Sequence, residues 1–168
     1  WTSLRRAAPC RCVPVNSNVR PHHVATKARL DTKLESVGAE FLVLGRLLLE
    51  RIPTFKAYVN YPGYDLVAVN ADANTSARIQ VKSRYRTDWD GFIINNFDCD
   101  FVVFAPLNRG YNRVKSSGDT GVLEPHFYVL PIAWVKKARD PQNSWGKIIR
   151  SRLKGIEQFQ DRWELIAQ

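Results

Sequence analysis

The sequence predicts a mixed α/β (α+β) domain, in which helices flank one central mixed sheet. Two observations lead to this prediction. A leucine-rich segment over residues 31–52 has apolar residues at helical spacing. Several short apolar or alternating runs follow it between residues 55 and 130, as is typical of strands. The 168 residues suffice for one domain with its own core.

The charge balance points to a polyanionic partner. The formal net charge is +9 and the isoelectric point is near 9.7, which favours nucleic acid or an anionic membrane surface. No apolar run approaches the length that a bilayer requires. We therefore expect DNA as the partner and no membrane association.

Residues 1–30 differ in composition from the rest. They contain six Lys and Arg residues, three prolines and no acidic residue. We predict a basic, flexible arm there, followed by a single domain over residues 31–168. The arm either contacts phosphates, is a leader or transit segment, or has no selected role.

The cysteines do not indicate a metal site. Cys10, Cys12 and Cys99 are odd in number, and Cys10-x-Cys12 has no second pair. Reduced thiols in a cytoplasmic, intracellular protein with access to DNA are the expected state.

A helix is predicted over residues 31–52. Asp31 or Thr32 can cap it, with Glu35 in capping-box position, and Pro53 ends it. The predicted solvated face carries Glu35, Arg46 and Glu50. The predicted buried stripe consists of Leu34, Val37, Phe41, Leu44, Leu48 and Ile52.

Glu40 lies on the flank of that stripe, where a carboxylate is costly unless something pairs with it. Two explanations remain open. Glu40 is a boundary residue that bonds Arg51 or water, or it is an acid aimed at a site between the helix and the sheet.

The strands are expected in a meander. Phe55, Ala57, Val59 and Tyr61 alternate, and Pro62-Gly63 turns the chain. The following strands are predicted over residues 65–69, 78–83, 101–105 and 127–130, with a hairpin loop over residues 70–76. The wholly apolar run at 101–105 predicts a central strand that is buried on both faces.

The remaining segments are predicted from composition. A Gly-, Ser- and Asn-rich loop covers residues 108–121, and Pro131 begins a short helix that runs to Lys137. A basic amphipathic helix is predicted over residues 147–166.

Three polar residues are expected to converge on two of these strands. Gln80 and Lys82 are two residues apart, so they share a face, while Ile79 and Val81 pack on the other. If the strand that begins at Asp65 is the neighbour, its carboxylate joins them. Such a group can hold a divalent cation against a phosphate.

Five motifs in this order resemble the PD-(D/E)XK nuclease superfamily over roughly residues 33–137. They look most like the branch that includes intron-encoded homing endonucleases, in which Gln replaces the second acidic residue. The motifs are Gly38-x-Glu40, Tyr64-Asp65-Leu66-Val67, Gln80-Val81-Lys82-Ser83, Asp98-x-Asp100-Phe101 and Phe127-Tyr128-Val129-Leu130-Pro131.

The resemblance implies a restriction-endonuclease-like core and hydrolysis of DNA phosphodiester bonds. It implies Glu40, Asp65, Gln80 and Lys82 as catalytic residues. Asp65, Gln80, Glu40 and the main-chain carbonyl of Val81 would bind Mg²⁺, with Mn²⁺ as a substitute. Gln80 departs from the parent pattern, and an amide binds a cation less strongly than a carboxylate does.

Structural explanations stand beside these roles. Asp65 can cap a turn, and Gln80 and Lys82 can form the solvent face of a half-exposed strand. Asp98 and Asp100 are interpreted as turn and edge charges rather than metal ligands. Candidate DNA contacts are the polar and basic residues after Lys82 and in the loop that follows the central strand: Ser83, Arg84, Arg86, Arg109, Arg113 and Lys115.

Two functions from different classes follow from the sequence. The first is a Mg²⁺-dependent endodeoxyribonuclease of homing or restriction type, or one that acts on branched or damaged DNA. It is expected to be a homo-oligomer, because one centre cuts one strand of double-stranded DNA. The second is a DNA-binding module on a nuclease-like fold that no longer cuts.

Overall fold

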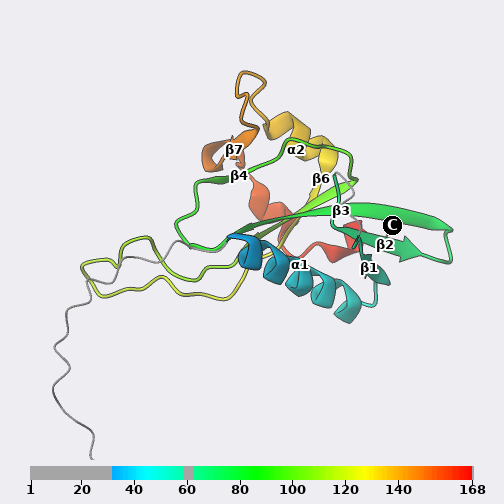
Figure 1. Cartoon of the computed structure of the whole chain (residues 1–168), viewed down its shortest axis with the longest axis horizontal. Helices are drawn as coiled ribbons and strands as arrows, with labels where there is room; N and C mark the ends of the chain where they lie inside the picture. The colour runs from blue at the N-terminus through cyan, green and yellow to red at the C-terminus, as the bar shows by residue number, and fades with distance from the viewer. Residues whose placement is uncertain (1–31, 59–62, 168) are drawn as a thin grey trace, which may run out of the picture. The chain divides into compact units, whose positions relative to one another are not determined.

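A five-stranded mixed sheet forms the centre of the fold in the computed structural model, which describes residues 32–58 and 63–167 (Figure 1). The strand order is β1 (Thr54–Lys56), β2 (Leu66–Asn70), β3 (Thr75–Arg84), β5 (Phe101–Pro106) and β6 (Tyr128–Pro131). β3 and β5 are parallel, and the other neighbouring pairs are antiparallel. The mixed α/β class is therefore confirmed.

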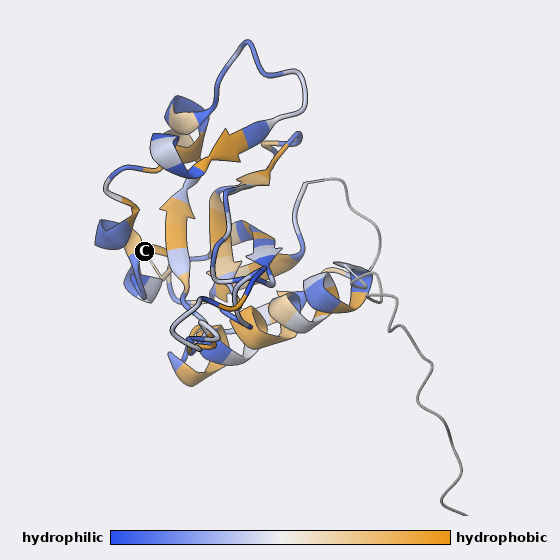
Figure 2. Cartoon of the chain, turned by 90° about the vertical axis from the view of Figure 1, so that its left-hand side faces the viewer, coloured by the Kyte–Doolittle hydropathy of each residue, from blue (hydrophilic) through white to orange (hydrophobic). Residues whose placement is uncertain are grey.

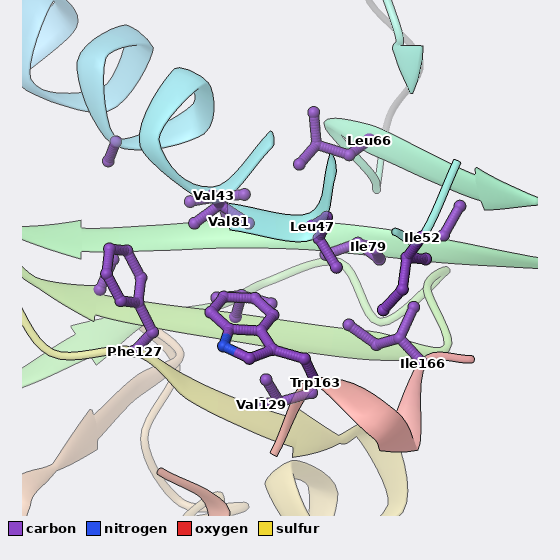
Figure 3. Close-up of a cluster of buried hydrophobic side chains, with 14 of the residues drawn as sticks. Val43, Leu47, Ile52, Leu66, Ile79, Val81, Phe127, Val129, Trp163 and Ile166 are labelled. Carbon is purple, nitrogen blue, oxygen red and sulfur yellow. The ribbon is translucent and has the colours of Figure 1, made fainter. Parts of the chain in front are cut away.

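Helices cover the two faces of the sheet. α1 (Thr32–Leu49) packs on one face through the apolar cluster drawn in Figure 3. On the other face lie α2 (Ile132–Ala138) and a small sheet of β4 (Gly91–Ile93) and β7 (Lys147–Ile149). The strands of the central sheet are largely hydrophobic in Figure 2, as expected for a middle layer.

The buried stripe of α1 differs from the predicted one. Ala39, Val43 and Leu47 face the sheet and are fully buried, with Ile52 beyond the helix. Leu44 is only partly buried, and the other members of the predicted stripe are exposed: Leu34, Val37, Phe41 and Leu48. These three buried residues are four positions apart, and the first is a small alanine. The helix therefore contacts the sheet through a narrower row of side chains than the leucine-rich sequence suggests.

The alternation at β1 is out of phase with the prediction. Thr54 is buried, whereas Phe55 is 64% exposed. The strand ends at Lys56, and Val59, Tyr61 and Pro62 lie outside the described residues. Gly63 follows with φ of 122°, and a Cβ there would lie 2.9 Å from the Asp98 carbonyl oxygen. This close approach requires glycine.

The predicted central strand is confirmed. β5 lies between β3 and β6 and is buried on both faces, with Val102 and Phe104 on the α2 side and Val103 and Ala105 on the α1 side. β2 is shifted by one residue from the predicted range and β3 is longer at both ends, so the turn between them spans only residues 71–74.

The predicted helix over residues 147–166 is wrong. This segment forms β7 and then three 3-10 turns, η1 (Arg150–Arg152), η2 (Ile156–Phe159) and η3 (Trp163–Leu165). Gly155 and Asp161 have φ of 80° and 51°, and such left-handed residues break a continuous helix. The apolar spacing instead sends Leu153, Ile156 and Trp163 into the core.

Residues Asp31–Gln168 form one compact unit. The basic arm over residues 1–30, with Cys10 and Cys12, lies outside the described residues and stays a prediction. Cys99 is buried and free. Among the helices that the structure describes, none has the length and apolar character of a membrane span.

Leu47 and Leu48 give a matched test of the α1 packing. Leu47→Ala should lower the free energy of unfolding by about 2–5 kcal/mol, because it opens a cavity in the core. Leu48→Ala should change it by less than about 1 kcal/mol, because Leu48 is already 52% exposed and leaves no cavity in the core. Urea denaturation of both variants measures the difference. A larger loss in Leu48→Ala would contradict the observed packing.

Candidate active site

Asp65 stands where the pairing of β2 and β3 ends. The last paired residues are Leu66 and Ile79, so Asp65 lies opposite Gln80. The Asp65 amide donates to the Ile79 carbonyl oxygen at 2.8 Å, and the Ala57 amide donates to the Asp65 carbonyl oxygen at 2.9 Å. Leu66 faces α1, so strand alternation directs Asp65 to the opposite face, toward Gln80 and Lys82. The predicted convergence of these three residues is thus present.

The Asp65 carboxylate takes the place of a main-chain carbonyl as the acceptor for an amide of β3. Its Oδ2 accepts a hydrogen bond of 2.7 Å from the Val81 amide. Burial raises the pKa of Asp65 and outweighs the lowering by this hydrogen bond, and the Glu40 carboxylate raises the pKa further. The ammonium groups of Lys82 and Lys56 act in the opposite direction. A buried carboxylate beside charged partners makes Asp65 a candidate for a functional role.

Lys82 lies two residues beyond Gln80 on the same face. Burial lowers the pKa of Lys82, while the Asp65 carboxylate raises it. The two groups therefore interact electrostatically across the strand pair. Cys99 is close by, and burial raises its pKa to about 11. Its thiol is neutral at neutral pH and adds no formal charge to the group.

Gln80 carries an unsatisfied polar atom. The residue is 8% exposed, and its side-chain Oε1 accepts no hydrogen bond within the described residues. A buried carbonyl oxygen without a partner loses its hydration energy and gains nothing in return. A bound cation or water would satisfy it. Buried orphan atoms of this kind are rare in folded proteins and need a physical explanation.

Glu40 is held by a residue that the sequence did not suggest. Lys56 on β1 forms an ion pair with it, and their side chains are only 14% and 17% exposed. Lys56 pairs with Leu66, so this contact lies on the α1 side of the sheet, across from Gln80 and Lys82. Glu40 still acts on Asp65 through its charge. The alternation of side chains along β1 could have indicated Lys56. The sequence pattern predicts Phe55 on the buried face, whereas the structure places Lys56 there.

Glu35 also faces inward, contrary to the prediction that it is solvated. It accepts a hydrogen bond of 3.0 Å from the Ser83 hydroxyl. The helical repeat puts Glu35 on the same face as buried Ala39 and Val43, one turn apart. Ser83 is therefore directed toward α1 and away from the face of Lys82.

The other predicted DNA contacts are spread over two regions. Arg84 donates to the Gly91 carbonyl oxygen at 2.6 Å and to the Ser83 carbonyl oxygen, so its guanidinium supports the loop after β3. Arg86 bonds the Asn112 side chain. The residues Arg109, Arg113 and Lys115 lie on an exposed segment between β5 and β6.

Asp98 and Asp100 both bond Arg78, which agrees with their interpretation as turn and edge charges. Neither contacts the group around Asp65 directly in the described residues.

The donors present fit a hard cation with few charged ligands. Oδ1 of Asp65 accepts no hydrogen bond from the described residues, and Oε1 of Gln80 is unsatisfied beside it. Carboxylate and amide oxygens are the ligands that Mg²⁺ prefers. No group of three or more His, Cys, Asp and Glu residues that could hold a metal occurs in the part of the chain that the structure describes.

Comparisons with known proteins identify the fold. No protein-family model matches the chain, and no curated protein matches it. Among solved structures, the chain is similar to a bacterial homing endonuclease, I-Ssp6803I, with a TM-score of 0.51 and 23% sequence identity. The match covers 82% of this chain and 91% of that one. The chain therefore has a nuclease-like fold.

Asp65→Asn should stabilise the protein at neutral pH. An acid whose pKa is raised by folding holds its proton more tightly in the folded state. Below the ordinary pKa of 3.8 the acid is protonated in both states, so it costs no stability. Above its raised pKa in the folded protein, ionisation lowers the stability by the full cost of the shift. The asparagine retains an oxygen for the Val81 amide but no charge. Thermal unfolding at pH 7 and pH 4 should show a stability gain that shrinks at the lower pH. A less stable variant at pH 7 would contradict the raised pKa.

Proposed function

We propose that this chain is a metal-dependent DNA endonuclease of the PD-(D/E)XK superfamily, with the Gln-x-Lys form of the motif. The observation that carries the proposal is the unsatisfied Oε1 of buried Gln80 beside the Asp65 carboxylate and the Lys82 ammonium. The net charge of +9 supports a DNA substrate. The nuclease-like fold supports the reaction class.

Asp65 and Gln80 would hold Mg²⁺, or Mn²⁺ in its place, with the Val81 carbonyl oxygen as a further ligand. Held there, such a cation would supply Lewis acidity toward a phosphoryl oxygen and would lower the pKa of a bound water. The hydrogen bond from the Val81 amide fixes Asp65 Oδ2 and leaves Oδ1 available. The chain thus presents one charged side-chain oxygen, from Asp65, and one neutral one, from Gln80.

Lys82 acts on the reacting phosphate. Its ammonium orients the attacking water or stabilises the charge that develops on the phosphoryl oxygens. Water adds to phosphorus, one bridging P–O bond breaks, and the products are a phosphate monoester and a free hydroxyl. Partial burial strengthens the field of Lys82 at the phosphate, and the Asp65 carboxylate opposes the lowering of the Lys82 pKa by burial.

Glu40 has two possible arrangements in this mechanism. In the structure its carboxylate is paired with Lys56, on the α1 side of the site. From there it influences the charge of Asp65, which makes it a positioning residue. Binding to the cation through water would require release from Lys56.

A second candidate is a DNA-binding module that has lost cleavage. It is favoured by the absence of a second carboxylate where the parent motif has one, since fewer charges bind a cation less strongly. A nuclease for branched or damaged DNA is a variant of the first candidate. The proposal also includes a homo-oligomer, because each centre cuts one strand and duplex cleavage needs two.

Cleavage assays separate these candidates. Plasmid, linear duplex and branched DNA should be nicked or cut in Mg²⁺ or Mn²⁺ and left intact in EDTA. Lys82→Ala and Asp65→Asn should each reduce the rate by about 10²–10³ while duplex binding persists. Lys136→Ala, the same loss of charge at an exposed position on α2, should cut normally.

Binding without any nicking in Mg²⁺ or Mn²⁺ would leave the binding module as the function. Equal losses in Lys136→Ala and Lys82→Ala would point to a general effect of charge on DNA affinity.

Gln80→Glu tests the metal site without a cleavage readout. The new carboxylate restores the acidic pair of the parent motif and should tighten Mn²⁺ binding about tenfold or more, as measured by calorimetry. Gln158→Glu makes the same change at an exposed position and should leave the affinity unchanged. A Gln80→Glu variant that binds Mn²⁺ no better than the unmodified protein would argue against Gln80 as a ligand.

A further inference from the structure

Residues 108–122, which we call the basic ribbon, run out and back between β5 and β6. Arg109 forms a bridge with Val122, and the Tyr111 amide donates to the Thr120 carbonyl oxygen at 2.9 Å. The Lys115 amide donates to the Asp119 carbonyl oxygen at 3.2 Å. Figure 1 shows this light green to yellow segment extending away from the central sheet. A two-armed ribbon was not predicted from the sequence, which suggested only a loop.

The root of the ribbon is rigidly built. The Thr87 amide donates to the Gly110 carbonyl oxygen at 3.0 Å, and the Thr87 hydroxyl bonds the Gly121 carbonyl oxygen. The Tyr111 ring lies so close to Gly121 that a Cβ there would be 2.4 Å from it. The two arms are therefore held together at a fixed position beside the segment that follows β3.

The outer part of the ribbon has no core beneath it. Every residue from Asn112 to Thr120 is exposed, including Val114. The tip is a tight turn from Lys115 to Gly118, closed by a hydrogen bond of 2.9 Å. A long exposed excursion with little packing of its own is commonly functional.

The exposed charge on the ribbon is mostly positive. The side chains of Arg109 and Arg113 have no partner within the described residues. The ribbon contains one acidic residue, Asp119. Lys115 contacts Asp119 and lies over the Tyr111 ring at 4.4 Å. The two arginines are thus available to bind an anion or the edge of a base.

The ribbon begins next to the candidate active site. β3 and β5 are parallel, and their carboxyl ends lead directly into the ribbon and its support. Lys82 pairs with Phe104, only four residues before the ribbon starts. At about 3.3 Å per residue, the seven residues from Asn108 to Lys115 reach at most about 23 Å. That reach is less than one turn of B-DNA, about 34 Å.

We propose that the basic ribbon enters the major groove of duplex DNA and contacts base edges through Arg113. Arg109, nearer the root, contacts phosphate. The major groove is about 12 Å wide and admits a two-stranded ribbon, whereas the minor groove is about 6 Å wide. The planar guanidinium of an arginine suits the paired acceptors of guanine. This inference rests on the proposed function, and it assigns a base contact to a residue that the sequence predicts only as a DNA contact.

Selection from a pool of duplexes with a randomised centre tests the inference. The full-length protein, in Ca²⁺ without Mg²⁺, should enrich a sequence motif. Arg113→Ala should lose the preference at one or two adjacent positions, roughly 5- to 150-fold per base pair, and retain it elsewhere. Arg162→Ala, an exposed charge beside Glu164 far along the chain, should give the unchanged motif.

The opposite outcomes are distinct. Arg113→Ala could instead bind all sequences more weakly and keep the motif, with the slope of log affinity against log salt concentration smaller by about one. The ribbon would then follow phosphates, and the inference would be wrong. If the unmodified protein binds and cuts duplex DNA but enriches no motif, the inference fails and the endonuclease proposal stands. If it binds no duplex DNA, both fail.

Discussion

The hydrogen bond from the Val81 amide to the Asp65 carboxylate is the contact on which the candidate site depends. It forms where the β2–β3 pairing ends, so a side chain satisfies an amide that the neighbouring main chain leaves unpaired. The same contact fixes Asp65 opposite Gln80 and within electrostatic reach of Lys82. Without this hydrogen bond, nothing would offset the cost of half-burying the Asp65 carboxylate except the charges of Lys82 and Lys56.

The group around Asp65 is poorly optimised for stability. Burial raises the pKa of Asp65, burial lowers the pKa of Lys82, and Gln80 has an unsatisfied oxygen. The rest of this part of the sheet is well packed, with Phe104 and Val102 fully buried on the same face. Unsatisfied buried nitrogen atoms also occur at Arg46, Arg139 and Trp163, but only at Asp65 do several unfavourable terms meet among the described residues, as is typical of functional sites. This contrast is the physical basis of the proposed endonuclease site.

The sequence predicted what depends on local pattern and missed what depends on packing. The apolar run of β5 and the Gln-x-Lys alternation of β3 each allow one placement in a sheet, and both were predicted. On α1, apolar residues occur on more than one face, so Leu48 was expected in the core and Leu47 is found there. Lys56 was missed because its partner, Glu40, is distant in sequence. The predicted C-terminal helix is absent because left-handed backbone at Gly155 and Asp161 interrupts the amphipathic spacing.

Crystals of the unmodified protein soaked in Mn²⁺ give the most direct measurement of the central claim. Anomalous diffraction should show one strong peak bounded by Asp65 Oδ1, Gln80 Oε1 and the Val81 carbonyl oxygen. The Val81 amide should still donate to Asp65 Oδ2, and Lys82 should remain on the same side of the sheet. A peak elsewhere, or a Gln80 side chain turned away with no cation beside Asp65, would contradict the account.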